Sequence, residues 1–107
     1  PYSYEIKRQL GVMPETLEQY GAVSEPTIKE MANMVRTKFN ADIGVATSGI
    51  AGPGGATPEK PIGTVWIGYS DKHQTVTKKL QLSTDRAINI KMASIAVLNL
   101  IRLSLQK

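Results

Sequence analysis

The sequence predicts an α/β fold, because two long helical patterns are combined with three short stretches that are typical of strands. Residues 28–39 and 88–105 place apolar side chains three and four positions apart, so that they gather on one side of a helix. Residues 43–47, 64–69 and 74–82 are short, rich in β-branched and apolar side chains, and bounded by turn residues. A chain of 107 residues forms at most one domain, which is small for a complete α/β enzyme.

Two short helices are expected at the start of the chain. Residues 2–10 carry an apolar or aromatic side chain at every fourth position, which favours a helix that ends at Gly11. Pro14 suits the first turn of a second helix, and Gly21 ends that helix after one or two turns.

The clearest helix follows Ser24, which is a favourable N-cap, and Pro26 is tolerated in its first turn. Its apolar side chains form a single stripe, while the charged side chains face away from that stripe. The stripe consists of Ile28, Met31, Ala32, Val35 and Phe39. We therefore expect this helix to be part of the scaffold.

Three strands are expected in one sheet. Residues 43–47 are small and β-branched, which indicates burial on both faces and a central position. Residues 64–69 and 74–82 flank a polar turn and predict a β-hairpin, whose second strand lies at the edge of the sheet. His73 belongs to this turn and is expected to face solvent.

The last helix is expected to start with Ser83 or Thr84 as its cap and with Asp85 in its first turn. Its apolar side chains form a band that is wider than one packing face. The band comprises one stripe of Ile88, Met92, Ile95, Leu98, Ile101 and Leu105, and a second of Ile90, Ala93, Val97 and Leu100. Such a helix is either deeply enclosed or placed at a subunit contact, so we expect a homodimer or a larger homo-oligomer.

The stretch from Ala46 to Thr64 is the most distinctive part of the chain. It holds five of the nine glycines and three of the six prolines, so we expect a shaped loop with no helix or regular strand through it. Its backbone N–H groups, hydroxyls and Lys60 would suit an anion such as a phosphate. It matches neither the phosphate-loop pattern nor Gly-x-Gly-x-x-Gly. Many such loops only connect two elements, and that interpretation stays open.

Composition excludes several classes of function. The 13 basic and 9 acidic residues give a net charge of +4, but the cations are dispersed and the aromatic residues are few, so nucleic acid is not an expected partner. The lack of cysteine and the single histidine exclude thiol and histidine-cluster sites, so neither a metal nor a cofactor is expected. No uninterrupted apolar run approaches the roughly 20 residues that span a bilayer, and we expect a cytoplasmic protein with no membrane partner.

Two sequence blocks are highly specific: Ser-Gly-Ile-Ala-Gly-Pro at residues 48–53 and Lys-Pro-x-Gly-Thr at residues 60–64. With further blocks from about Tyr2 to Arg86, they resemble the competence/damage-inducible protein family and, more narrowly, its C-terminal nicotinamide-nucleotide amidohydrolase domain. The resemblance implies a three-layer α/β/α sandwich with a mixed sheet. It also implies hydrolysis of the carboxamide of nicotinamide mononucleotide, without a metal, to nicotinic acid mononucleotide and ammonia.

The catalytic candidates follow from the needs of amide hydrolysis, which are an activated hydroxyl, a base and donors for the oxyanion. The segment Tyr2-Ser3-x-Glu5-x-Lys7 is similar to the family's Tyr-Ser-Asn-Glu-x-Lys, with Tyr4 in place of Asn. Because the chain has no cysteine and its histidine lies in a turn, the base candidates are Lys7 with a lowered pKa, or Tyr2 as a relay to it. A surface lysine and a core tyrosine remain the ordinary alternatives.

Substrate-binding candidates lie mainly in the loop. Ser48 is its catalytic candidate, and the Ser48 hydroxyl is expected to hold the amide or its ribose-phosphate. Lys60 would order the loop or touch phosphate, and Thr64 would contact substrate or bond its own strand. Arg86 resembles the family's Gly-Asp-Arg and is a second phosphate candidate, with a surface arginine as the alternative. The backbone candidates are Gly49, Ile50, Ala51, Gly52, Gly54 and Gly55.

The family's domain begins with a further strand and helix that carry an Ala-Glu-Ser-Cys-Thr-Gly-Gly segment, and nothing in this chain is similar to it. We therefore expect residues 1–107 to form a single amidohydrolase-like domain that lacks its N-terminal strand-helix segment. The nucleophilic serine would lie in that segment. The alternative function is a non-catalytic nucleotide-sensing or assembly domain.

Overall fold

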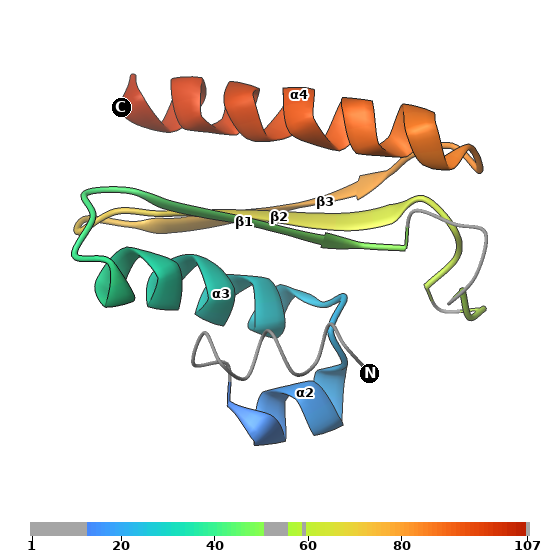
Figure 1. Cartoon of the computed structure of the whole chain (residues 1–107), viewed down its shortest axis with the longest axis horizontal. Helices are drawn as coiled ribbons and strands as arrows, with labels where there is room; N and C mark the ends of the chain where they lie inside the picture. The colour runs from blue at the N-terminus through green and yellow to red at the C-terminus, as the bar shows by residue number, and fades with distance from the viewer. Residues whose placement is uncertain (1–12, 51–55, 59, 107) are drawn as a thin grey trace.

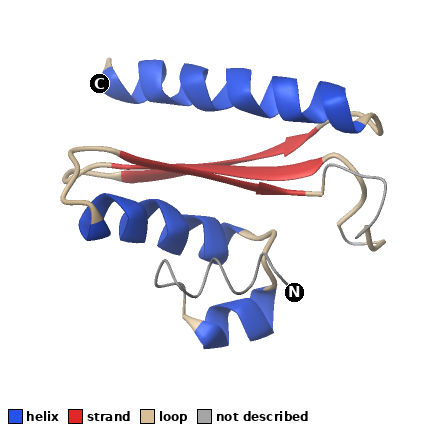
Figure 2. Cartoon of the chain, in the orientation of Figure 1, coloured by secondary structure: helices blue, strands red, loops and turns tan. Residues whose placement is uncertain are grey.

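The computed structural model describes residues 13–50, 56–58 and 60–106. In these residues the elements follow in the order α2 (Pro14–Tyr20), α3 (Glu25–Lys38), β1 (Gly44–Gly49), β2 (Thr64–Ser70), β3 (Thr75–Gln81) and α4 (Arg86–Leu105). Figure 1 shows α3 along one face of the sheet and α4 along the other, with α2 packed against α3. This arrangement of helices and strands (Figure 2) confirms the predicted α/β class.

The sheet has the order β1-β2-β3, and both neighbouring pairs are antiparallel. In the two ladders, Val45 lies opposite Tyr69 and Val65 lies opposite Leu80. The predicted hairpin and its edge strand β3 are therefore confirmed. The expected mixed sheet is not found among the described strands, because consecutive strands that no crossover helix separates pair in the antiparallel sense.

Among the described strands the central one is β2, and β1, which was predicted to be central, lies at the edge. Every residue of β2 except Trp66 is buried, and β2 has a partner on each side. Strand β1 needs small residues for another reason, because α3 packs closely against it. A Cβ added to Gly44 would lie 2.3 Å from the carbonyl oxygen of Ala32.

Strand β1 also runs further than the sequence predicted. It continues to Gly49, so residues 46–49 of the predicted loop belong to a regular strand. Glycine weakens a strand but does not exclude one, and Gly49 has a packing reason: a Cβ there would lie 2.7 Å from a methyl carbon of Val65. The loop is therefore shorter than expected.

The helices α2 and α3 agree with the sequence in their bounds. Gly21 ends α2 with φ of 80°, and the Ser24 hydroxyl accepts a hydrogen bond from the N–H of Thr27 at the start of α3. Ile28 is fully buried, as the predicted stripe requires. Phe39 is the exception, because α3 ends at Lys38 and leaves Phe39 exposed as its C-cap. The helix predicted over residues 2–10 lies outside the described residues.

Two apolar clusters hold the layers together. On the α3 side of the sheet, the buried members are Leu17, Ile28, Met31, Ala32 and Ala46. On the α4 side, the buried members are Val65, Ile67, Tyr69 and Leu100. Alternate residues of β2 face opposite sides of the sheet. Half-buried Trp66 of β2 packs against the cluster on the α3 side, so this strand contributes to both clusters.

Helix α4 begins after Asp85, whose carboxylate accepts a hydrogen bond of 3.0 Å from the N–H of Ile88. The predicted caps, Ser83 and Thr84, were therefore one or two residues too early. The side of α4 that packs on the sheet carries Ala93, Ala96, Val97, Leu100 and Ile101. The predicted first stripe instead has five members that are between 45% and 68% exposed, namely Ile88, Met92, Ile95, Leu98 and Leu105.

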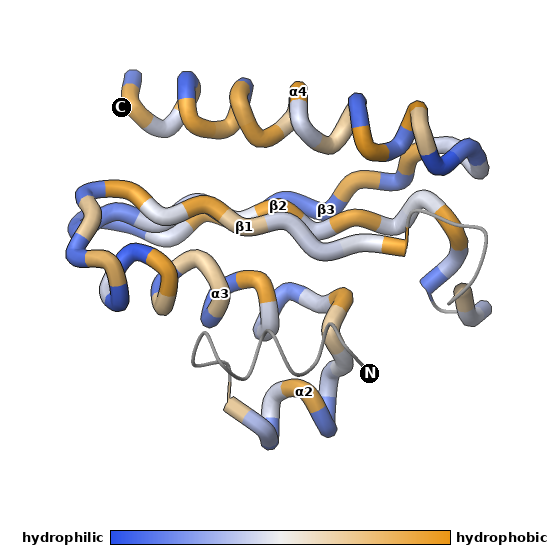
Figure 3. Tube along the Cα trace, viewed as in Figure 1, coloured by the Kyte–Doolittle hydropathy of each residue, from blue (hydrophilic) through white to orange (hydrophobic). Residues whose placement is uncertain are grey.

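Deep enclosure, one of the two explanations for this wide apolar band, is not found in the described part of the chain, because the sheet can cover only one side of a helix. Figure 3 shows apolar residues along most of α4. Among the described helices, α4 alone has the length and apolar composition to cross a bilayer, and 17% of the relevant window is buried. The expectation that no segment approaches that length was therefore too strict, although helices of soluble proteins can meet the same criterion.

Candidate functional site

The two arms of the Gly- and Pro-rich loop meet at a neck formed by Ile50, Gly63 and Thr64. The N–H of Ile50 donates to the carbonyl of Thr64 at 2.8 Å, and the N–H of Gly63 donates to the carbonyl of Ile50 at 2.6 Å. These bonds continue beyond the last pair of the β1–β2 ladder, with Gly63 and Thr64 both opposite Ile50. The prediction that the loop joins the ends of two strands in one sheet is confirmed.

Gly63 is a glycine for two reasons. Its φ of +91° lies in the region that side chains disfavour, and an added Cβ would lie 2.5 Å from the carbonyl oxygen of Ser83. The carbonyl of Gly63 also accepts a 2.8 Å hydrogen bond from the N–H of Leu82. The neck is thereby pressed against the chain that follows β3.

Gln81, at the end of β3, holds the second arm of the loop. Its side-chain amide donates to the carbonyl of Ile62 at 3.2 Å and accepts from the hydroxyl of Thr64 at 3.1 Å. The hydroxyl of Thr64 therefore bonds to the neighbouring strand β3. Sequence reasoning missed Gln81, because a polar residue on an edge strand usually faces solvent.

Ser48 lies on the face of β1 that points toward α3. It is 9% exposed, and its hydroxyl donates to the carbonyl of Ala22 at 2.8 Å. Thr47, the preceding residue, points to the opposite face and is exposed. The Ser48 hydroxyl is thus engaged inside the protein in this structure.

Lys60 links the second arm of the loop to the end of α2. Its ammonium donates to the carbonyl of Tyr20 at 2.6 Å, at the C-terminal end of α2, where helix carbonyls favour a cation. The backbone of Lys60 also exchanges hydrogen bonds of 3.0 and 3.1 Å with Thr57. One residue therefore closes a small turn and attaches it to the helical layer.

The turn of residues 20–22 receives side chains from three parts of the chain. The carbonyl of Gly21 accepts from the hydroxyls of Ser24 at 3.0 Å and Thr27 at 2.6 Å. The carbonyls on either side of it accept from the serine of β1 and the lysine of the loop described above. The turn therefore joins the loop, the sheet and α3.

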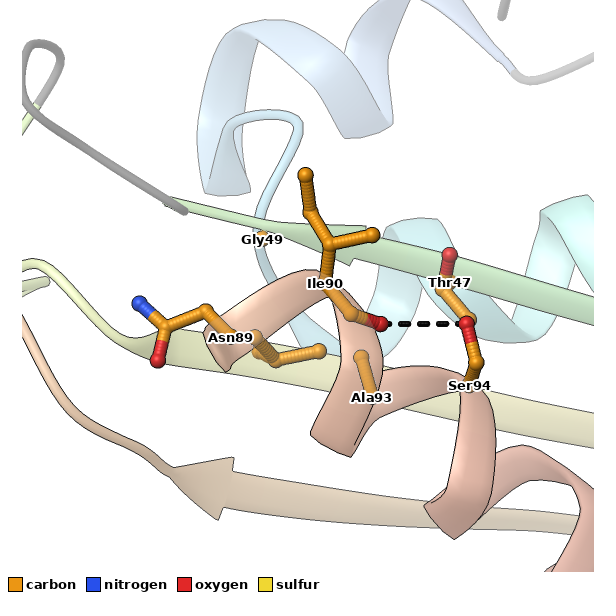
Figure 4. Close-up of a pocket in the computed structure, with 7 residues that line it drawn as sticks. Thr47, Gly49, Asn89, Ile90, Ala93 and Ser94 are labelled. Atoms are coloured by element: carbon orange, nitrogen blue, oxygen red, sulfur yellow. Dashed lines mark hydrogen bonds between the residues drawn. The ribbon is translucent and has the colours of Figure 1, made fainter. Parts of the chain in front are cut away.

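A pocket of about 180 Å³ lies between the end of β1, β2 and the first turns of α4 (Figure 4). It is smaller than pockets that hold whole drug-sized ligands, and it is mainly apolar with hydroxyl groups at its wall. The Ser94 hydroxyl donates to the carbonyl of Ile90 at 3.0 Å, as Figure 4 marks. The lining residues are Thr47, Gly49, Val65, Asn89, Ile90, Ala93 and Ser94.

Two described residues with shifted pKa values, Tyr69 and Asp71, lie at the opposite end of β2 from the neck. The hydroxyl of buried Tyr69 donates to a carboxylate oxygen of Asp71 at 2.7 Å. This hydrogen bond, burial and the nearby charge raise the pKa of Tyr69 to about 12. The same bond, together with the N–H groups of His73 and Gln74, holds the pKa of Asp71 below its ordinary value. These groups shape the β2–β3 turn, and His73 is exposed there as predicted.

Comparison with known proteins decides the family. A family model described as the CinA C-terminal domain matches residues 1–105. The chain belongs to this family. A CinA-like protein of Cytophaga hutchinsonii is 55% identical over 107 residues, and one of Amoebophilus asiaticus is 53% identical over 97 residues. The alignments cover 99% and 91% of this chain but 26% and 23% of those relatives.

Solved structures of competence/damage-inducible proteins have the same fold as the described chain. A competence or damage-inducible protein from Enterobacter asburiae superposes with a TM-score of 0.88 at 37% identity. A competence damage-inducible protein from Klebsiella pneumoniae gives 0.89 at 36% identity. Each alignment covers 95% of this chain and 64% of the other. The chain thus spans about a quarter of the curated relatives and under two thirds of these crystallised proteins.

In this CinA C-terminal domain the structure brings together part of the predicted site. Ile50 and Thr64 meet at the neck, and Gly49 precedes it as the last residue of β1. Ser48 and Lys60 both bind the turn of residues 20–22, and exposed Arg86 begins α4. Among the described residues, no group of three His, Cys, Asp or Glu side chains could hold a metal ion. The predicted residues outside the described part of the chain are Tyr2, Lys7, Ala51, Gly52, Gly54 and Gly55.

Proposed function

We propose that this chain is part of a nicotinamide-nucleotide amidohydrolase domain, which converts nicotinamide mononucleotide to nicotinic acid mononucleotide and ammonia in pyridine nucleotide recycling. The proposal rests on membership of the CinA C-terminal domain family. One observation supports it most directly: Ile50 of the first specific sequence block is hydrogen-bonded to Gly63 and Thr64 of the second at the neck of a single loop. A binding loop needs such a rigid base.

In the proposed reaction, a hydroxyl oxygen attacks the carboxamide carbon and its proton passes to Lys7, directly or through Tyr2. The tetrahedral intermediate then loses ammonia: Lys7 returns the proton to the amide nitrogen as the C–N bond breaks. Water then hydrolyses the resulting ester, which releases the carboxylate and regenerates the hydroxyl. Because the Ser48 hydroxyl already donates to a backbone carbonyl, Ser48 suits a supporting role better than that of nucleophile. The nucleophile would then come from the strand-helix segment that the family places before these residues.

The nucleotide itself would be held by two elements at the same end of the sheet. Figure 1 shows that the β1–β2 loop, the start of α3 and the start of α4 lie at this end. Arg86, the first residue of α4, offers a guanidinium to the phosphate, and the loop backbone offers N–H groups to the amide or the ribose. Lys60 supports the loop through the carbonyl of Tyr20.

The experiment compares two proteins: the 107-residue chain, and a longer protein that includes the further third of chain present in the crystallised relatives. Ammonia release and nicotinic acid mononucleotide formation are measured for both. We expect the longer protein to bind and deamidate the nucleotide, and the 107-residue chain to be inactive. Neither binding nor ammonia release by the longer protein would refute the function. Turnover by the short chain would place the nucleophile within residues 1–107.

A nucleotide-sensing domain without catalysis is the second candidate. The observation that favours it is that the hydroxyl of Ser48 and the ammonium of Lys60 are both engaged with backbone carbonyls. Calorimetry with nicotinamide mononucleotide on the longer protein, followed by product analysis, separates the two candidates. Binding without product formation would favour sensing.

We also propose that the complete domain is a three-layer α/β/α sandwich with a mixed sheet, and that it works in the cytoplasm without a cofactor, nucleic acid or membrane. We further propose a homodimer or larger homo-oligomer formed through the outer face of α4. Five large apolar side chains of that face are 45–68% exposed, which supports an interface on the scale of the ~800 Å² per partner of standard complexes.

Light scattering at about ten micromolar tests this assembly, because weak association depends on concentration. We expect a mass of at least two chains for the wild-type protein and of one chain for Leu98→Lys, which places a charge in the apolar face. Thr37→Lys adds the same charge at an exposed position of α3 and should leave the mass unchanged. A monomeric wild-type protein would refute the assembly.

A further inference from the structure

The buried side chain of Asn89 forms hydrogen bonds with both backbone groups of Ser83, as a neighbouring strand would. It is 1% exposed, although it lies in the first turns of α4. Its amide nitrogen donates to the carbonyl of Ser83 at 2.8 Å, and its amide oxygen accepts from the N–H of Ser83 at 2.9 Å. The Ser83 hydroxyl adds a third bond of 3.1 Å to the same oxygen. One side chain therefore holds the segment after β3 by both its N–H and its C=O.

This segment leads directly to the neck of the loop. Next to Ser83, the N–H of Leu82 donates to the carbonyl of Gly63, whose own N–H donates to the carbonyl of Ile50. The fit is tight, because a Cβ on Gly63 would lie 2.5 Å from the carbonyl oxygen of Ser83. A continuous row of hydrogen bonds therefore runs from Asn89 to the neck.

Asn89 also lies close in the helix to the phosphate candidate. Arg86 is three residues earlier in α4, which puts it on a neighbouring side of the same turn. The cap of the helix is fixed in addition by Asp85, whose carboxylate binds the N–H of Ile88. The side chain of Asn89 thus attaches the segment that carries Arg86 to the segment that carries the neck.

We propose that Asn89 is a positioning residue, which sets the placement of Arg86 relative to the loop neck and thereby the affinity for the phosphate of the nucleotide substrate. This inference rests on the proposed function. A phosphate remote from the amide is bound equally in the ground state and in the transition state. If Arg86 is wrongly placed, the enzyme therefore binds the phosphate less tightly, which raises KM and leaves kcat nearly unchanged.

The test uses Asn89→Asp and Asn89→Ala in the longer protein that deamidates nicotinamide mononucleotide. The aspartate keeps the acceptor oxygen but loses the donor to Ser83, whereas the alanine loses both. Loss of a buried hydrogen bond predicts a KM about tenfold higher, with kcat changed less than about twofold. For the nucleoside that lacks the phosphate, KM should be the same for variant and wild type.

The matched controls are Asn99→Asp and Asn99→Ala. Asn99 lies on the same helix but is exposed, and it accepts a hydrogen bond from Arg102. These variants should leave both KM values unchanged. A merely structural role for Asn89 would lower the melting temperature and the active fraction with no phosphate-specific change in KM, and that result would overturn the proposal.

Failure of the proposed function has a different signature. If the wild-type protein releases no ammonia, the proposed function is refuted. Amide hydrogen exchange then tests separately whether Asn89 holds the segment after β3 against the loop neck. Faster exchange at Leu82 and Gly63 in Asn89→Asp, but not in Asn99→Asp, would support the hydrogen-bonded row. Equal exchange in the two variants would overturn it.

Discussion

Helices α3 and α4 cover opposite faces of one sheet, but the sheet covers the apolar side chains of α3 more completely than those of α4. In α3 the buried apolar residues Ile28, Met31 and Ala32 face the sheet, and the residues on the other side are polar. In α4 an apolar side packs on the sheet, and a second apolar side is exposed, with Leu98 at 68%. The sheet therefore accounts for the sequence of α3, whereas the outer side of α4 needs a further partner to account for it.

The largest expected effect contrasts one residue from each helix. Ile28→Ala should lower the free energy of unfolding by about 2–5 kcal/mol, because Ile28 is fully buried and leaves a cavity. Leu98→Ala should cost less than about 0.5 kcal/mol where the protein is monomeric, since most of the side chain is in solvent. Urea unfolding of both variants measures the difference.

Protein concentration sharpens this contrast. If α4 pairs with a second copy, the free energy of unfolding that Leu98→Ala removes should increase with protein concentration. The free energy that Ile28→Ala removes should stay constant. Equal costs for the two variants in dilute, monomeric protein would show that another part of the same protein covers α4.

The next largest effect concerns how closely α3 approaches the sheet. Gly44→Ala should destabilise by about 1–3 kcal/mol, because its Cβ would meet the carbonyl oxygen of Ala32 at 2.3 Å. Gly68→Ala is the matched control, since its Cβ would lie 3.2 Å from the carbonyl oxygen of Ile28 and needs only a small shift. Thermal unfolding compares them. Similar losses for both variants would contradict the assigned contact at Gly44.

The same contrast explains what could be predicted from the sequence. Helix α3 was predictable because its cap, Ser24, and its apolar stripe are local signals that agree with each other. The β2–β3 hairpin was predictable for the same reason, from two strand patterns around a polar turn. In both cases the information lies within a few residues of the element that it describes.

The errors arose where a distant contact decides the outcome. The small residues of β1 indicated a central strand, but Gly44 is small because α3 touches it. Ser83 was a reasonable helix cap, yet the buried amide of Asn89 binds it and Asp85 caps α4. Sequence reasoning also missed the bond from the hydroxyl of Ser48 to the carbonyl of Ala22, which joins positions 26 apart in the sequence.

A smaller effect is expected at Ser48. Ser48→Ala should cost about 1 kcal/mol of stability, because the carbonyl of Ala22 loses a partner in a partly buried place. Thr47→Ala, on the exposed opposite face of β1, should cost less than about 0.5 kcal/mol. Turnover by the longer protein should fall only moderately with Ser48→Ala. A loss of about a thousandfold or more would instead identify Ser48 as the nucleophile.

The smallest effect is a pH dependence on the α4 side of the sheet, where Tyr69 donates to Asp71. The pKa of Asp71 is below its ordinary value of 3.8 in the folded protein, so the unfolded chain binds the proton more readily as the pH falls. Stability from this carboxylate is therefore present above about pH 4 and is lost below it. Asp71→Asn should flatten that acid limb of the stability curve, measured by urea unfolding at several pH values.

At alkaline pH the stability of the protein is expected to fall as the pH rises, and a second variant tests this. The pKa of Tyr69 is raised from 10.0 to about 12 in the folded protein, so the unfolded chain loses the proton first as the pH rises. The stability that this hydroxyl contributes is present below pH 10 and declines toward pH 12. Tyr69→Phe should remove the alkaline decline and also weaken the acid limb, because Asp71 then loses its largest stabilising partner. An unchanged acid limb in Tyr69→Phe would show that the N–H groups of the turn alone hold this carboxylate.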